Sequence, residues 1–433
     1  MSKIQSVKGM NDLLPDTIDQ WHRIESSIRQ VAWQYGYQEI RTPILEKTEL
    51  FKQSIGDQTD IVEKEMYTFA DAGDVSLTMR PEATASTVRA CNQHGLLHNQ
   101  QQRLWYMGPM FRRERPQKGR YRQFHQFGIE AFGWNGPDID AEIIQVGARL
   151  WKNLGIRDIS LLVNTLGSES SRKTYRSELQ AYLQRYEADL DADSRRRLHS
   201  NPLRVLDSKA EKTREILEQA PKMGDFLDPD ALAHFEGFRG LLEAMEIPYT
   251  VDDRLVRGLD YYTSTVFEWV TGSLGAQSAV CAGGRYDNLV EHRGGKPTPA
   301  IGFAMGVERL IELAAIETEI DQKRCPDIYV IPVDAAQQSL AIKLAERLRD
   351  ANLFVVTHCG GGKIRNQMKR ADSSGATLTL MLGESEVASG SVTVKRMRAE
   401  TDPGDASTAQ TEIKLDDAVG YCVEQLARFN CPN

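Results

Sequence analysis

Hydrophobic and polar positions alternate on both sides of a basic loop in residues 103–134, and this pattern predicts two strands. In the second strand, positions 125, 127, 129 and 131 form a mostly apolar face, because strand side chains alternate with a period of two. We expect Gly128, on the other face, to leave an open space that suits a small polar ligand. The alternative is an ordinary antiparallel hairpin with one solvated face. That other face is poor core material and consists of Arg122, Phe124, Gln126, Gly128 and Glu130.

Helical and strand-like periods follow one another in the first 167 residues. Pro43 interrupts a strand-like run, as proline does at a sheet edge or a kink. The expected elements are a helix at 16–35, a strand at 37–41, short strands at 60–70 and 75–80, and a helix followed by a strand across 138–165.

The character of the chain changes twice after residue 167. Residues 168–247 are highly charged and helix-forming, which predicts a separate helical insertion. Strand-rich sequence then resumes, with an expected turn at Gly283-Gly284 that would let a ligand approach the backbone closely. From 326 to 433, alternating strands and helices predict an independent α/β domain with a parallel sheet.

A cluster of basic residues and a single arginine at a helix start indicate that the chain binds phosphates. Residues 112–122 hold six basic side chains against one acid. Arg309 falls in the first turn of a predicted helix, where a cation is unfavourable unless an anion lies nearby. Arg195–Arg197 in the insertion either contact RNA or belong to a solvated helix face.

Composition restricts the class of protein. The 433 residues carry a net charge of −8, which argues against a non-specific nucleic-acid coat and limits RNA contacts to local basic patches. The six cysteines have no zinc-site spacing, and His94 and His98 lack a third ligand nearby, so no metal site formed by protein ligands is expected. Without a signal-like segment or a long apolar run, we expect a soluble cytoplasmic protein that does not bind membranes.

Five stretches together resemble a known family. Phe111-Arg112-Arg113-Glu114, the loop after it and the strand to Glu130 resemble the second signature motif of class II aminoacyl-tRNA synthetases, in its bacterial histidyl-tRNA synthetase form. LVRGLDYY at 255–262 and AGGRYD at 282–287 resemble the two histidine-specific signatures of that family. The strand around Pro43 resembles the first class II motif, and the segment containing Arg309 resembles the third.

The resemblance extends over essentially the whole chain and implies its architecture. It implies an α/β protein whose α+β catalytic domain, built on an antiparallel sheet, is formed by residues 1–167 and 248–322. The helical insertion would take residues 168–247, and residues 326–433 would form the C-terminal anticodon-binding domain.

The resemblance also implies ATP-dependent attachment of L-histidine to histidine tRNA through a histidyl-adenylate. The enzyme would be a homodimer that uses ATP as a substrate, together with Mg²⁺. Arg112 and Arg257 would be catalytic. The residues implied to bind histidine are Glu82, Ala83, Thr84, Arg112, Gln126, Glu130, Arg257, Tyr261, Tyr262 and Tyr286. Those implied to bind ATP are Arg112, Glu114, Phe124 and Arg309, and those implied to contact the acceptor end of the tRNA are Arg115 and Gln117.

Several alternatives remain open. Glu82 follows a proline at a helix start, where its carboxylate could instead cap exposed amides. Lys363, Arg365, Lys369 and Arg370 are either a footprint for RNA phosphates or a solvated helix face. A non-catalytic paralogue that regulates a histidine-biosynthesis transferase is a different function, but such paralogues generally lack the C-terminal domain and signature residues. A class II synthetase for another amino acid is disfavoured by LVRGLDYY and AGGRYD.

Overall fold

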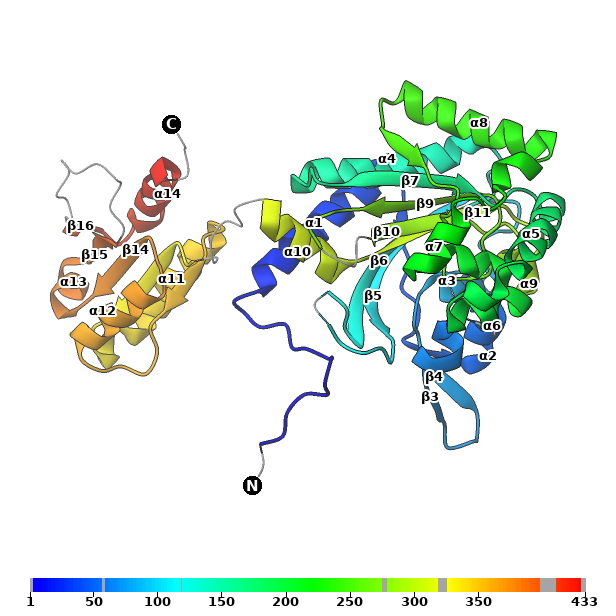
Figure 1. The fold of residues 1–433 in the computed structure, drawn as a ribbon. Coiled ribbons are helices and arrows are strands. Elements are labelled where there is room, and N and C mark those ends of the chain that lie inside the picture. Colours follow the sequence, from blue (N-terminus) through cyan, green and yellow to red (C-terminus); the bar gives the residue numbers. More distant parts are fainter. Residues whose placement is uncertain are drawn as a thin grey trace. The chain divides into compact units, whose positions relative to one another are not determined.

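The computed structural model describes residues 3–56, 59–117, 119–274, 279–317, 325–397 and 410–429. The chain forms two compact units, residues 1–321 and 322–433, and each is described by itself (Figure 1). No helix within these described ranges is long and apolar enough to cross a membrane.

The first unit is built on an eight-stranded sheet in the order β1-β5-β6-β11-β10-β9-β7-β8. Its interior pairs are all antiparallel, whereas β1 and β8 pair in parallel at the two edges. The predicted hairpin is confirmed as β5 and β6. The strands are β1 (Gln38–Glu39), β5 (Gln102–Phe111), β6 (Gln123–Phe132), β7 (Ser160–Thr165), β8 (Tyr249–Val251), β9 (Thr265–Val270), β10 (Ala279–Arg285) and β11 (Ala300–Gly306).

Three helices cover one face of this sheet and bury its apolar residues. The apolar stripe of α1 (Ile18–Gln34) includes Ile24 and Ile28, which pack into the same core as Phe127 and Ile129 of β6. The helix α4 (Pro137–Leu154) begins with proline at its first turn and ends at Gly155 in the left-handed conformation, as capping preferences predict. The third helix is α10 (Val307–Glu317). The opposite sheet face carries polar residues together with smaller apolar clusters, such as the one around Leu104 and Phe132.

A small three-stranded sheet with the order β2-β4-β3 protrudes from this unit (Figure 1). The strand predicted at 60–70 is wrong in its first half, because residues 61–65 form a short π-helix, η1. Acidic side chains of Asp60 and Glu63 there pair with Arg197 and Arg196 of the insertion. The elements of this region are β2 (Leu45–Lys47), α2 (Thr48–Ile55), β3 (Tyr67–Ala70), β4 (Ser76–Met79), α3 (Thr84–Gln93) and, after β10, α9 (Leu289–His292).

The predicted insertion contains helices that differ in what they pack against. The first part has a core of its own around Tyr175, Leu179 and Leu198. The last helix, α8 (Pro229–Ala244), instead lies beside α4, and its Phe238 and Leu242 join the main core (Figure 1). The boundaries of the insertion stay a prediction, and this packing favours an end before α8. The other helices are α5 (Glu169–Gln184), α6 (Ala192–Ser200), α7 (Glu211–Leu217) and the short 3-10 turns η2 (Glu187–Asp189), η3 (Pro202–Asp207) and η4 (Met223–Phe226).

The second unit has a five-stranded sheet in the order β13-β12-β14-β15-β16. The prediction of a parallel sheet holds for β12, β13 and β14 but is wrong for β15 and β16, which pair antiparallel. Residues 383–390 between β14 and β15 are too few for a parallel crossover, which takes a dozen or more residues. The elements are β12 (Ile328–Pro332), η5 (Ala335–Gln337), α11 (Gln338–Asp350), β13 (Val355–Thr357), α12 (Ile364–Ser373), β14 (Leu378–Leu382), α13 (Glu384–Ser389), β15 (Ser391–Arg396), β16 (Gln410–Lys414) and α14 (Ala418–Phe429).

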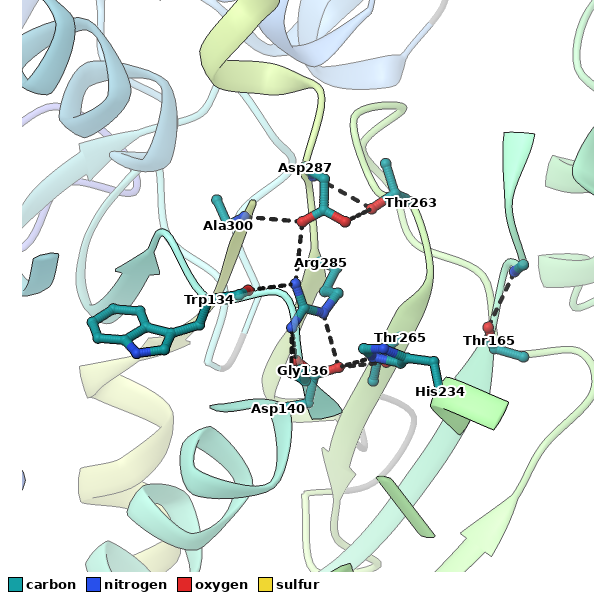
Figure 2. A network of polar contacts seen from close by, with 11 residues as sticks. Trp134, Gly136, Asp140, Thr165, His234, Thr263, Thr265, Arg285, Asp287 and Ala300 are labelled. Carbon is teal, nitrogen blue, oxygen red and sulfur yellow. Dashed lines mark hydrogen bonds and ion pairs between the residues drawn. The ribbon is translucent and has the colours of Figure 1, made fainter. Parts of the chain in front are cut away.

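A buried polar network joins the helices of the first unit to its sheet (Figure 2). The guanidinium of Arg285, at the end of β10, forms two contacts of 2.7 and 3.0 Å with the carboxylate of Asp140 in α4. Asp140 also accepts hydrogen bonds from Thr265 of β9 and pairs with His234 of α8. Because Arg285 and Asp140 are almost completely shielded from water, each charge depends on the other.

Asp140→Asn should therefore destabilise the first unit strongly. Removing one charge breaks the buried pair and leaves the Arg285 guanidinium with only the partly exposed Asp287, at 3.3 Å, as a counter-ion. Breaking a buried pair typically costs about 3–5 kcal/mol. Urea unfolding should show a fall of that order in the free energy of unfolding. As a control, Glu25→Gln removes an exposed pair with Arg29 and should change it by less than about 1 kcal/mol. Equal effects of the two substitutions would contradict a structural role for the Asp140 charge.

Candidate active site

A cavity opens on the sheet face opposite α1 and α4, and twelve of the predicted site residues line it. Strand β6 provides its floor, and β10, β11 and the segment before β9 provide its walls. The predicted residues found there are Glu82, Thr84, Arg112, Glu114, Phe124, Gln126, Glu130, Arg257, Tyr261, Tyr262, Tyr286 and Arg309.

The deepest carboxyl group of the cavity belongs to Glu130. Its side chain is buried and accepts hydrogen bonds from the hydroxyls of Thr84, at 2.7 Å, and Tyr286. Burial raises the pKa of Glu130 to about 8, although both hydroxyl contacts favour the charged form. The group is therefore poised to change its charge when a ligand supplies a further donor.

Gly128 does not leave the open space that its position predicted. The register of the hairpin sets Gly128 opposite Tyr106 of β5, and the Tyr106 ring lies over Gly128 of β6. A Cβ atom added at Gly128 would lie only 2.4 Å from the Tyr106 hydroxyl. The glycine therefore makes room for a protein side chain, and the prediction of empty space is wrong.

The amide-capping alternative for Glu82 is what the structure displays. The two carboxylate oxygens of Glu82 accept hydrogen bonds from the backbone N–H groups of Thr84 and Ala85, at 2.6 and 3.0 Å. Burial raises the pKa of Glu82, and its neighbours at the start of α3 partly offset this. Nearby, the side-chain oxygen of Gln126 is buried without a hydrogen-bond partner among the described residues. A buried acceptor of this kind calls for a donor on a ligand.

Three arginines at the other end of the cavity form a site for an anion. Burial lowers the pKa of Arg309, and the charges of Arg120 and Arg112 lower it further. The Arg112 guanidinium lies over the Phe124 ring, 5.2 Å from its centroid, and donates to the carbonyl oxygen of Pro81. Repulsion among these cations falls when a phosphate enters, so a polyphosphate suits this end.

A fourth guanidinium, that of Arg257, lies against the wall of the cavity. It donates a hydrogen bond of 2.8 Å to Glu268 of β9, and its centre is 5.9 Å from that of the Tyr262 ring. Glu268 also lines the cavity but was not predicted, because nothing in the run Phe267-Glu268-Trp269 distinguishes it from an ordinary strand residue. Its partner Arg257 carried the only signal.

Glu308 and Arg120 are further cavity residues that sequence reasoning did not assign. Glu308 accepts hydrogen bonds from the backbone N–H of His125 and contacts its ring at 3.0 Å. Arg120 pairs with Glu114 at 2.7 Å. Both could have been suspected, because Glu308 precedes Arg309 and Arg120 belongs to the basic loop.

Three predicted residues do not line the cavity. Ala83 lies behind its wall, where it packs with Tyr106 and Met110. Arg115 and Gln117 are exposed on the loop between β5 and β6.

The two glycines of AGGRYD have a packing function. Gly283 and Gly284 lie within β10, so the predicted turn is wrong. A Cβ at Gly283 would come within 2.3 Å of the carbonyl oxygen of Gly302, and one at Gly284 within 2.5 Å of that of Thr265. Neighbouring strands, and not a ligand, approach these glycines closely.

Comparisons with known proteins agree with this geometry. Residues 9–310 match the family model for histidyl-tRNA synthetase, and residues 327–425 match that for an anticodon binding domain. The chain is 35% identical to apo histidyl-tRNA synthetase from S. aureus, with 97% of this chain and 99% of that chain covered and a TM-score of 0.80.

Two more distant solved structures share the fold. Histidyl-tRNA synthetase from Nostoc sp. PCC 7120 is 19% identical, with 98% of this chain and 100% of that chain covered and a TM-score of 0.69. An ATP phosphoribosyltransferase regulatory subunit/histidyl-tRNA synthetase from Bacillus halodurans is 22% identical, with coverages of 86% and 97% and a TM-score of 0.63. From the family match over most of the sequence, this chain belongs to the histidyl-tRNA synthetases, class II enzymes that attach histidine to tRNA with ATP as a substrate.

Proposed function

We propose that the cavity binds histidine at its Glu130 end and ATP at its arginine end, and joins them as histidyl-adenylate. The observation that carries this assignment is the continuity of the two ends. One cavity holds both the buried carboxyl group of Glu130 and the cluster of Arg112, Arg120 and Arg309. Two reactants held side by side in this way need no further encounter before they react.

The histidine end supplies a partner for each polar group of the amino acid. An imidazole N–H donates to Glu130, and Tyr262 and Tyr286 enclose the ring, with Tyr261 beside them. The α-ammonium donates to the free oxygen of Gln126 and to the groups at Glu82 and Thr84, which Ala83 supports from behind. A site built on such contacts rejects amino acids that leave its buried polar atoms unpaired.

At the other end, Phe124 stacks under adenine, Glu114 lies near the adenine amino group, and Arg309 binds the γ-phosphate. The histidine carboxylate attacks the α-phosphorus, and the bond to the bridging oxygen breaks to release pyrophosphate. Arg112 and Arg257 stabilise the charge that develops on the α-phosphate, because a guanidinium stays charged and holds phosphate in a planar fork. The attacking carboxylate is already ionised, so this step needs no general base.

The carboxylates present fit a magnesium ion that arrives with ATP. Magnesium takes phosphate oxygens and water together with only one or two carboxylates, and Glu268 and Glu308 line the same cavity. Such an ion would neutralise charge on the β- and γ-phosphates. Among the described residues no three potential ligands converge, so a site formed by protein ligands alone is not proposed.

For the transfer step, we assign Arg115 and Gln117 to the acceptor end of histidine tRNA. They are exposed on the loop between β5 and β6, beside the cavity. The 3′-terminal hydroxyl attacks the histidyl carbonyl carbon, AMP leaves, and the adenylate phosphate accepts the proton. The exposed side chains of Lys363, Arg365, Lys369 and Arg370, at α12, would bind RNA phosphates in the second unit.

The enzyme is proposed to act as a homodimer in the cytoplasm, where its substrates are found. Large apolar side chains are exposed on and beside the small sheet, as expected of a face that a second copy covers. These are Ile44, Leu45, Phe69 and Val75, with exposed fractions from 41 to 46%. The alternative function of a regulatory subunit is disfavoured, because the arginines and Glu130 all line one cavity and the anticodon-domain match is present.

Arg257→Ala should leave the protein folded and dimeric but nearly abolish adenylate formation. Losing one pre-organised contact to transition-state charge costs about 3 kcal/mol or more, a factor of about a hundred in rate. Single-turnover adenylation without tRNA measures this directly. The matched control is Arg254→Ala, which removes an arginine paired only loosely with Asp252 at 3.8 Å. A near-normal rate for the Arg257 variant would reject its catalytic role.

Histidine affinity should rise with pH until Glu130 is ionised, at about pH 8. The imidazole N–H binds the ionised carboxylate. Below this pKa, Glu130 must first lose its proton, and this cost lowers histidine affinity by up to about tenfold per pH unit. Titration calorimetry between pH 7 and pH 8.5 tests the slope, which Glu130→Gln should remove while ATP affinity stays unchanged. Equal losses of histidine and ATP affinity in this variant would mean that the carboxyl group is structural.

The raised pKa of Glu130 also affects the stability of the enzyme without histidine, so it can be tested without any binding measurement. Because the pKa of Glu130 is raised above its unfolded value, the folded state holds the proton longer. The protonated Glu130 side chain contributes fully to the free energy of unfolding below about pH 4. This contribution falls by roughly 1.4 kcal/mol per pH unit as pH rises to about 8. Glu130→Gln should thus gain stability relative to the native enzyme as pH rises over this range in thermal unfolding.

A chain ending at residue 322 should still catalyse histidine-dependent pyrophosphate exchange while charging tRNA poorly. All proposed chemistry lies in the first unit, and the second has its own sheet and core.

In the full chain, alanine at 363, 365, 369 and 370 should lower the salt slope of tRNA binding by roughly one unit per lost phosphate contact. Alanine at the exposed residues Lys343 and Arg428 of α11 and α14 serves as the control. An unchanged slope would assign RNA binding elsewhere.

A further inference from the structure

The segment Val256–Tyr262 carries three cavity residues without the support of regular structure. It lies in the loop between β8 and β9, where no helix or strand is formed. Arg257, Tyr261 and Tyr262 project from it into the cavity. A loop has few ladder hydrogen bonds to fix it, so the position of these side chains depends on contacts from outside the segment.

The core of the first unit holds this loop mainly at its ends. The side chain of Asn164 donates to the carbonyl oxygen of Leu255, and the backbone N–H of Thr263 donates to that of Arg285. Between these points, the carbonyl of Ile55 accepts from the N–H of Asp260 at 3.2 Å, and Glu268 of β9 accepts from the Arg257 side chain. Leu259 and Tyr262 also pack on apolar side chains of the first unit, but these contacts do not hold the backbone of residues 257 and 262.

The insertion holds the middle of the segment. Arg204 in η3 donates a hydrogen bond of 2.8 Å to the backbone carbonyl of Arg257. Arg172 in α5 donates one of 2.9 Å to the carbonyl of Tyr262. Asn201 donates to the carboxylate of Asp260. The side chain of Val256 packs against the core of the insertion.

The buried position of Arg172 is unfavourable for a charged side chain. Its Nε atom is buried without a hydrogen-bond partner among the described residues, and Glu169 acts on it only through a longer-range attraction. Burial lowers the pKa of Arg172, which reflects the cost of placing this charge out of water. An apolar side chain of similar length would pack at this position without that cost. The guanidinium is the feature that reaches Tyr262.

We propose that Arg204 and Arg172 are positioning residues through which the helical insertion sets Arg257 and Tyr262 in the active site. The inference rests on the proposed function of those two residues. Arg204 fixes the backbone that carries the catalytic guanidinium, and Arg172 fixes the backbone that carries the imidazole-binding ring. The insertion therefore contributes to adenylate formation itself, before any tRNA is bound.

The test uses the full-length enzyme without tRNA and replaces each arginine by methionine, which keeps the apolar stem. Arg204→Met should lower kcat for adenylate formation about tenfold or more with little change in the KM for ATP, because a misplaced Arg257 loses its transition-state contact. Arg172→Met should mainly raise the KM for histidine. The matched control is Arg185→Met, which replaces an exposed arginine at the C-terminal end of the same helix. This variant should stay within about twofold of the native enzyme.

A double substitution shows whether Arg204 acts through Arg257. Added to Arg257→Ala, Arg204→Met should cause no further loss of rate, whereas general loosening of the enzyme would lower the residual rate again. Where Arg204→Met also lowers the melting temperature, Arg204→Lys, which retains a donor, should restore a large part of kcat. An unrestored rate, or effects equal to those of Arg185→Met, would overturn the proposal. Full activity of Arg257→Ala alone would instead reject the proposed function of Arg257.

Discussion

The ion pair between Arg285 and Asp140 connects β10 of the active-site sheet to α4, and through further contacts of the two side chains to β9 and α8. Placing two charges in the protein interior is unfavourable unless their geometry and remaining hydrogen bonds compensate. Here Arg285 also donates to the carbonyl oxygens of Trp134 and Gly136, and Asp287 accepts from the N–H of Ala300 at the start of β11 (Figure 2). The strands, α4 and α8 are thereby fixed to one another directly behind the cavity.

The electrostatic design of the cavity follows from this rigid frame. Its two ends oppose each other: a carboxyl group that burial keeps partly protonated, and arginines whose mutual repulsion favours an incoming anion. Regular elements carry Glu130 and Arg309, whereas Arg112 and Arg120 lie on the loop between β5 and β6. Glu130 is set by the hairpin, whereas Arg257 and Tyr262 depend on the insertion, so sheet and insertion divide the support of the site between them.

Local periodicity was enough to predict the hairpin, α1 and α4, because amphipathic alternation is a property of neighbours along the chain. The cavity residues in the motifs were also found, since Arg112, Glu130 and Arg309 stand in unusual sequence settings. Glu268 was missed because its role depends on a partner eleven positions away on another segment. The Gly283-Gly284 turn was predicted wrongly because a glycine pattern does not say whether a ligand or a neighbouring strand needs the space. Antiparallel β15 and β16 required knowledge of the connection between strands.

The contact between Gly128 and Tyr106 has a consequence for how the protein can change by mutation. The ring occupies part of the volume of the missing side chain, and the backbone carbonyl oxygen of Phe303 in β11 would lie 2.8 Å from a Cβ atom at position 128. Any larger residue at position 128 therefore collides with both a side chain and a backbone. A larger residue at position 128 would overfill the cavity floor, and a smaller residue at position 106 would leave a void beside Glu130. A smaller residue at position 106 would not open position 128, because the backbone of β11 stays in place. Over evolutionary time glycine at 128 is therefore tied to the pairing of β6 with β11, and a lineage that keeps this sheet inherits the shape of the pocket floor with it.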